Sequence, residues 1–100
     1  MKRQALDVGS WFDLDLASSF LESTDWDGRN EISCATGSQW DHETLYLTKK
    51  GKWVLNSYSA WQGSSESWEI VTDSVAADWL VQNRRQIPSI LDNEVASHEI

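Results

Sequence analysis

The chain has 100 residues, of which 40% are hydrophobic and 24% charged, and 16 acidic against 8 basic side chains give a net charge of −8. These values are typical of a folded globular protein and exclude a disordered tract or a fibrous repeat. The acidic balance disfavours direct nucleic-acid binding, because affinity for a phosphate backbone comes chiefly from lysine and arginine. We expect one domain over residues 1–100, loosely ordered at residues 1–8 and 97–100.

Three features of the sequence favour a cytoplasmic protein without membrane association. The longest apolar runs, at residues 53–55 and 79–81, are far shorter than the roughly 20 residues that span a bilayer. No apolar region of a secretory signal follows Lys2 and Arg3. The single cysteine, Cys34, forms no internal disulfide and suits a reducing compartment.

The first predicted element is a short helix at residues 14–22. Asp13 provides an acidic N-cap, and Leu16, Phe20 and Leu21 recur at helical spacing. Two serines in the middle lower the helix propensity, so packing of the apolar side chains has to hold this helix in place. Two smaller elements are predicted next in the chain: a turn at residues 25–28 and a strand at residues 31–36.

The clearest predicted unit is a β-hairpin over residues 44–61. Gly51 can take the left-handed position of a type I turn with a G1 bulge, and this turn fixes the register. Leu47 then faces Trp53, and Leu45 faces Leu55, so one face of the hairpin is apolar. The other face is mixed, which is typical of a half-covered surface. It carries Thr44, Tyr46, Thr48, Val54, Asn56 and Tyr58.

A further strand at residues 67–72 leads into the best-supported helix. Thr72 or Asp73 caps this helix, which we expect to end near Gln82. Its predicted buried face consists of Val75, Ala76, Trp79 and Leu80. Pro88 can open a last short helix at residues 89–96. The predicted fold class is α+β: a three- to four-stranded antiparallel sheet, with a short N-terminal helix and C-terminal helices packed on one face.

Groups with catalytic potential are few and weak. His42 lies between Asp41 and Glu43, where it can serve as a general base, or bind a metal together with His98 and a carboxylate. In a strand, however, Asp41 and Glu43 point to the face opposite His42. Cys34 beside His42 is a possible nucleophile and base pair, but a lone cysteine in a strand is usually a small buried hydrophobe. We assign no catalytic residue, no metal and no cofactor.

Seven tryptophans are the most unusual feature of the composition. Trp53, Trp68 and Trp79 fall at positions that predict a core role. Trp40 and Trp61 stand at strand ends or loops beside glutamines, where an aromatic ring can line a cleft or an interface. The candidate ligand or interface residues are therefore Gln39, Trp40, Tyr46, Asn56, Tyr58, Trp61 and Gln62.

One part of the chain carries a resemblance to known sequences. Residues 44–83 pair a "TLY-T-G-W-L" hairpin with a "W-G-S" loop and a helix containing "AADWL". This segment resembles a loose group of small uncharacterised bacterial proteins, similar in size and style to those encoded by integron gene cassettes on mobile DNA. The resemblance implies a bacterial, accessory, cytosolic protein with an α+β fold that associates with itself. It implies no catalytic residue.

Three hypotheses about function follow. The first is a non-enzymatic protein that forms a homodimer, or binds another protein, through the sheet face around Tyr46, Val54 and Tyr58 or through an exposed strand edge. The second is a small-molecule binder with a pocket walled by Trp40 and Trp61. The third is an acidic inhibitor that imitates nucleic acid and binds a basic partner. It would use the carboxylates of Asp13, Asp15, Glu22, Asp25, Asp27 and Glu31.

Overall fold

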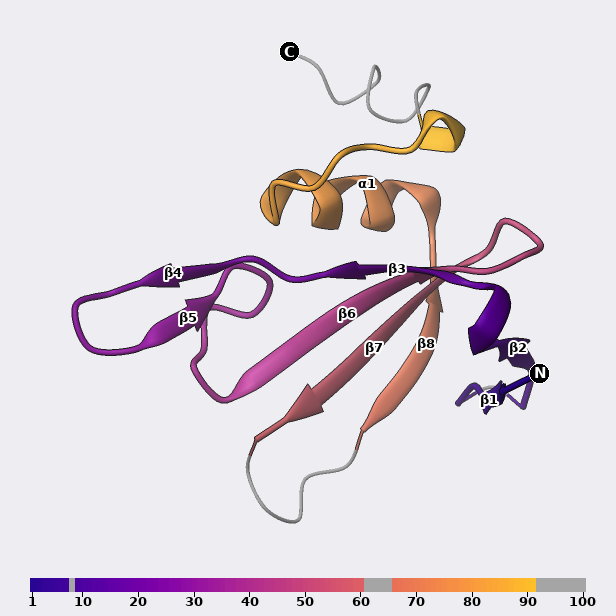
Figure 1. Ribbon diagram of the computed structural model, residues 1–100, viewed down its shortest axis with the longest axis horizontal. Helices are drawn as coiled ribbons and strands as arrows, with labels where there is room; N and C mark the ends of the chain where they lie inside the picture. The colour runs from indigo at the N-terminus through magenta and orange to yellow at the C-terminus, as the bar shows by residue number, and fades with distance from the viewer. Residues whose placement is uncertain (8, 61–65, 92–100) are drawn as a thin grey trace.

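The computed structural model describes residues 1–7, 9–60 and 66–91, and its centre is a four-stranded antiparallel sheet in the order β3–β6–β7–β8 (Figure 1). These strands are β3 (Ser18–Leu21), β6 (Asp41–Leu47), β7 (Trp53–Ser59) and β8 (Ser67–Val71). Two smaller antiparallel pairs are β1 (Arg3–Ala5) with β2 (Trp11–Asp13), and β4 (Thr24–Trp26) with β5 (Glu31–Ser33). The helical elements are α1 (Asp73–Gln82) and the 3-10 turns η1 (Leu14–Leu16) and η2 (Ser89–Leu91). The protein is thus mostly β.

The predicted hairpin is confirmed with its register. β6 pairs with β7 so that Leu47 faces Trp53 and Leu45 faces Leu55. Gly51 has a φ of 82°, in the left-handed region that suits a residue without a Cβ. The turn is closed by backbone hydrogen bonds from Thr48 N–H to the carbonyl of Lys52 and from Gly51 N–H to the carbonyl of Thr48.

Helix α1 covers the apolar face of this hairpin (Figure 1). Of the two predicted caps, Thr72 is the N-cap, and its hydroxyl accepts the Val75 N–H at 3.2 Å. The buried helix residues are Ala76, Ala77, Trp79 and Leu80. The prediction that Val75 belongs to this face was wrong, because its side chain is 46% exposed and Ala77 is buried instead. Phe20 of β3 and Leu91 of η2 complete the cluster.

The second face of the sheet is covered by the chain's own N-terminal hairpin. Leu6 and Phe12 pack on Val54 and Trp68, with Tyr46 beside them. Arg3–Ala5 therefore forms a strand in the stretch where loose order was expected, because pairing with β2 and burial of Leu6 hold it. The face around Tyr46 and Val54, expected to be available for self-association, is largely occupied within one chain. Trp68 is a core residue, as predicted, but it belongs to this second face.

The predicted N-terminal helix at residues 14–22 was wrong. Only Leu14–Leu16 forms a helical turn, of the 3-10 type, and residues 18–21 then pair with β6 as strand β3. The edge of β6 offers these residues backbone partners, whereas two central serines and a short length make an isolated helix unstable. Phe20 is half-buried on the helix-covered face, with its ring 5.8 Å from that of Trp53, and Leu21 points outward.

The outer edge of β3 is closed by the end of α1. The buried Asn83 side chain accepts the Ser23 N–H at 3.0 Å and donates to the Trp79 carbonyl at 2.8 Å. Arg85 donates to the carbonyls of Leu21 and Glu22 at 2.7 and 3.1 Å. These two carbonyl groups would otherwise accept hydrogen bonds from an added strand. Because Arg85 occupies them, another strand cannot pair readily at this edge.

The β4–β5 hairpin extends away from the central sheet, on the side opposite β1 and β2 (Figure 1). A turn with Gly28 at a φ of 102° is present, but it begins after Trp26, later than the predicted residues 25–28, because Asp25 and Trp26 pair with β5 as part of β4. The strand predicted at residues 31–36 is shorter, Glu31–Ser33.

Of the helix predicted at 89–96, Ser89–Leu91 is a 3-10 turn and the remainder lies outside the described residues. No helix of the described residues is long and apolar enough to cross a membrane.

Candidate functional site

A polar hollow lies at the end of β6 and β7 that is remote from their connecting turn. The residues that line it are Thr36, Asp41, His42, Glu43, Ser57, Tyr58, Ser59 and Ser67, and its volume is about 410 Å³. The strand register explains why polar groups gather there. Glu43 pairs with Ser57, and Ser57 pairs with Ser67, on the same face as Leu45 and Leu55 farther along the strands. One sheet face therefore changes from apolar under α1 to acidic and hydroxyl-bearing at this end.

Glu43 is the central acidic group of the hollow. Trp79 Nε1 of α1 donates to Glu43 Oε1 at 3.1 Å, so the same indole both fills the core and holds the carboxylate. Burial raises the pKa of Glu43, and the nearby charges of Glu22 and Glu69 raise it further, against the lowering effect of the Trp79 and Ser57 hydrogen bonds. Among the described residues, Glu43 makes no ion pair. Within the described part of the chain, no basic side chain therefore neutralises the Glu43 carboxylate.

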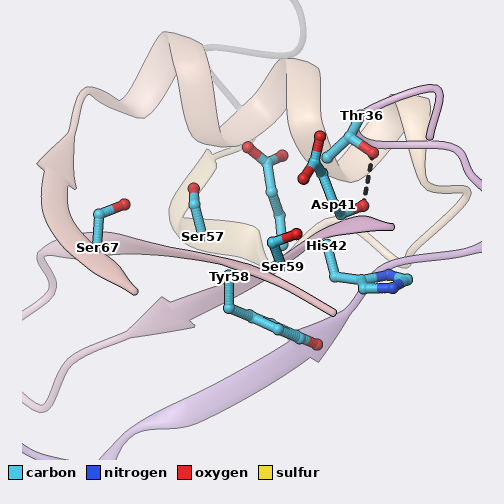
Figure 2. A pocket seen from close by; sticks show the side chains of 8 residues that line it. Thr36, Asp41, His42, Ser57, Tyr58, Ser59 and Ser67 are labelled. Atoms are coloured by element: carbon cyan, nitrogen blue, oxygen red, sulfur yellow. Dashed lines mark hydrogen bonds between the residues drawn. The ribbon is translucent and has the colours of Figure 1, made fainter. Parts of the chain in front are cut away.

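Glu22 and His42 form a second polar group beside the hollow. Glu22 is only 10% exposed at its side chain; its Oε2 lies 2.7 Å from His42 Nδ1, and its Oε1 accepts the Glu43 N–H at 2.7 Å. The ring of His42 stacks near Tyr58, with centroids 5.6 Å apart. Figure 2 shows these two rings on one side of the strands, while Asp41 and Ser57 point to the other. The prediction that His42 faces away from Asp41 is thereby confirmed.

This arrangement does not assemble a nucleophile with a base. His42 is directed to Glu22 and Tyr58, away from the serines that face α1. Cys34 lies apart from His42, with its Sγ 3.4 Å from Asp25 Oδ2, and burial and that carboxylate raise the pKa of the thiol. A raised pKa leaves little thiolate to attack a substrate. No group of three or more His, Cys, Asp and Glu side chains in the described part of the chain is placed to hold a metal ion.

The structure separates the residues that the sequence singled out as ligand or interface candidates. Tyr58 lines the hollow, but its ring is on the face away from Glu43. Tyr46 is half-buried against Phe12 and Trp68, and Asn56 is buried, donating to the Ser67 carbonyl at 3.1 Å.

The remaining candidates lie at the approach to β6 or beyond the described residues. Gln39 and the exposed Trp40 belong to the segment before β6 and do not line the hollow. Trp40 is fixed by its backbone, which accepts from Ala60 N–H at 2.8 Å and donates to Ser38 Oγ at 3.0 Å. Trp61 and Gln62 lie outside the described residues.

The site residue that the sequence undervalued is Glu43. Its two neighbours across the sheet, Ser57 and Ser67, are distant in sequence, and only strand pairing brings them together. The available signal was the alternation of Asp41 and Glu43, which placed both carboxylates on one face. Nothing local indicated that Trp79, predicted correctly as core, would also hold the Glu43 carboxylate.

The acidic residues between positions 13 and 31 are divided among several parts of the fold. Asp13 binds backbone N–H groups of Lys2 and Asp15, Glu22 turns inward to His42, and Asp25 pairs with Arg84 at 3.0 Å. β2 and β4 lie at opposite ends of the molecule (Figure 1), so these carboxylates do not make one continuous row.

No protein-family model, curated protein or solved structure matches the chain.

Proposed function

We propose that this protein is a small accessory bacterial binding protein without a catalytic step, and that the polar hollow takes a small organic cation bearing hydroxyl or further amino groups. The observation that carries the proposal is Glu43: a half-buried carboxylate with a raised pKa and no ion pair among the described residues. A bound ammonium group would replace the missing cation and favour the ionised form of Glu43.

The remaining lining supports the same class of ligand. Asp41 adds a second carboxylate on the Glu43 face, and Ser57, Ser59 and Ser67 provide hydroxyls that accept or donate to polar substituents. The volume of about 410 Å³ falls within the range of small-molecule sites, roughly 300 to 1,000 Å³. The hollow differs from the Trp-walled pocket expected from the sequence, because its recognition groups are carboxylates and hydroxyls.

The test compares cationic ligands with neutral molecules of similar size and shape. Glucosamine and putrescine are titrated by calorimetry against the full-length protein, with glucose and 1,4-butanediol as their neutral counterparts. We expect the cations to bind in a 1:1 ratio and the neutral molecules not to bind. Glu43→Gln should weaken binding about tenfold or more, the size of one lost charged hydrogen bond.

Glu31→Gln is the matched control, because Glu31 is an exposed carboxylate of β5 that does not line the hollow and whose charge does not shift the pKa of Glu43. It should leave the affinity nearly unchanged. Equal losses in the two variants would indicate a general attraction of cations to an acidic protein and would contradict a site at Glu43. Absence of binding by both cations would also reject the proposal.

A further inference from the structure

A second hollow lies at the other end of the β6–β7 hairpin, between its turn and the N-terminal hairpin, and has a volume of about 430 Å³. Buried Leu6, Phe12 and Val54 line its floor, and the side chains of Trp11, Leu16 and Ile70 around it are about half exposed. Exposed apolar groups gathered around a hollow mark a contact surface on many soluble proteins. We call this region the lysine-rimmed groove.

Its rim carries positive charge in a strongly acidic protein. Lys49, Lys50 and Lys52 line the groove, against one carboxylate in the lining, Asp13. None of the three lysines takes part in an ion pair among the described residues, whereas Arg84 and Arg85 are engaged with the β3–β4 region. Three of the eight basic residues of the chain thus lie close together without an ion pair among the described residues. The groove therefore suits a partner that carries an apolar group flanked by acidic side chains.

The tip of the β4–β5 hairpin carries that combination. Trp26 is 63% exposed, although an indole is a large apolar group that normally finds cover. Asp25 is already paired with Arg84, so the hairpin offers the charges of Asp27 and Glu31 against that of Arg29, a net charge of −1. Hydrogen bonds from the Asn30 and Arg29 N–H groups lower the pKa of Asp27, which keeps that carboxylate ionised.

The two surfaces cannot meet within one chain. β4 and β5 lie on the side of the central sheet opposite β1 and β2 (Figure 1), and β2 is the strand that lines the groove. Tryptophan is the residue most enriched among interface hot spots, and here its flanking charge is complementary to the lysines. We propose that the Trp26 hairpin of one copy docks in the lysine-rimmed groove of a second copy, giving a heterologous, head-to-tail assembly.

A head-to-tail contact and a two-fold symmetric dimer differ in the size of the assembly that we expect. Each copy has one donor tip and one acceptor groove, so chains of more than two copies or closed rings form. Sedimentation velocity should show species larger than the monomer as the wild-type concentration rises to hundreds of micromolar. Trp26→Ala and the triple variant K49E/K50E/K52E should each remain monomeric, because one half of the contact is lost in each.

The decisive experiment mixes the two variants in equal amounts. Trp26→Ala keeps its groove and the triple lysine variant keeps its tip, so the mixture should form a 1:1 heterodimer that grows no further. Trp40→Ala, which removes another exposed indole, should associate like the wild type. A wild-type protein that stays monomeric throughout, or a mixture without heterodimer, overturns the proposal.

Folding is checked for each variant by far-UV circular dichroism, and a misfolded triple variant is replaced by K49Q/K50Q/K52Q, which removes the charge without reversing it. The proposal goes beyond ligand binding and concerns a separate surface. Glucosamine and putrescine titrations of Trp26→Ala therefore distinguish the two, since that variant keeps the polar hollow intact whether or not it assembles.

Discussion

The two faces of the central sheet are covered in different ways. On one face, the ten-residue helix α1 buries Ala76, Trp79 and Leu80 against the β6–β7 hairpin. On the other, two three-residue strands place Leu6 and Phe12 on an aromatic cluster with Tyr46 and Trp68. The centroids of Phe12, Tyr46 and Trp68 lie 5.5 to 6.0 Å apart in pairs.

Helix α1 and the N-terminal hairpin differ in the number of contacts that hold each of them to the sheet. Helix α1 follows β8 directly and has a side-chain N-cap, and the residues after it bind the end of β3 through Arg85 and the segment after β3 through Asn83. The N-terminal hairpin is held to β8 through Asp7, whose N–H donates to the Trp68 carbonyl at 3.0 Å and whose Oδ2 accepts the Trp68 N–H at 3.3 Å. A short hairpin with few such bonds can open locally while the rest of the protein stays folded.

We expect the largest loss of stability from a substitution on the helix-covered face of the sheet. Leu80 is fully buried, so Leu80→Ala should lower the free energy of unfolding by about 3 to 5 kcal/mol, through lost burial and the cavity left behind. Urea denaturation followed by circular dichroism measures this. The exposed neighbour Val81 serves as control, and Val81→Ala should change stability by no more than about 0.5 kcal/mol. Similar losses at both positions would contradict the assignment of the core.

A smaller effect is expected on the opposite face. Phe12→Ala should cost about 1 to 3 kcal/mol, less than the usual 3 to 5 kcal/mol for a buried phenylalanine, because the hairpin can detach without global unfolding. Hydrogen exchange should accelerate at β1 and β2 in this variant while the amides of β6 and β7 stay protected. Uniform acceleration across the sheet would show that both covers belong to one cooperative unit.

The smallest effect concerns pH at the polar end of the helix-covered face. Because burial raises the pKa of Glu43 in the folded state, the folded protein binds the proton more tightly than the unfolded chain. Wild-type stability should therefore fall as pH rises from the ordinary glutamate value of 4.5 through the raised pKa. Glu43→Gln removes this loss and should be the more stable protein at neutral pH, with the difference shrinking in acid.

Denaturation of both proteins across that pH range measures the effect. Glu31→Gln, at an exposed position of β5 whose charge does not shift the pKa of Glu43, should follow the wild type throughout. A Glu43→Gln variant that is less stable than the wild type at neutral pH would mean that the hydrogen bond from Trp79 outweighs the cost of burying the charge.

Much of the sheet was predictable from local sequence. The turn at Gly51 requires a residue that tolerates positive φ, and period-two alternation then determines which side chains share a face. The boundaries of α1 followed from Thr72 as N-cap and from the helical spacing of its apolar residues. Both elements are specified by contacts between residues close in the chain.

The candidate site was predictable only in part. Alternation placed Asp41 and Glu43 on one face and His42 on the other, as the structure has them. It did not place Ser67 beside Ser57, nor the Trp79 indole beside the Glu43 carboxylate, because those contacts depend on which strands and helix pack together. Likewise, nothing in residues 1–12 indicated that Leu6 and Phe12 would cover the second face.

The sequence by itself determined the β6–β7 register, the extent of α1 and the core role of Trp53, Trp68 and Trp79, because turn chemistry, capping and periodicity act within a few residues. Only the tertiary structure decided that residues 18–21 pair as a strand rather than coil into a helix. The free edge of β6 offered these residues backbone partners and a place for Phe20 against Trp53. Partners far apart in sequence outweigh a weak local helix preference, and the same partners placed Glu43 in its hollow and left Trp26 exposed.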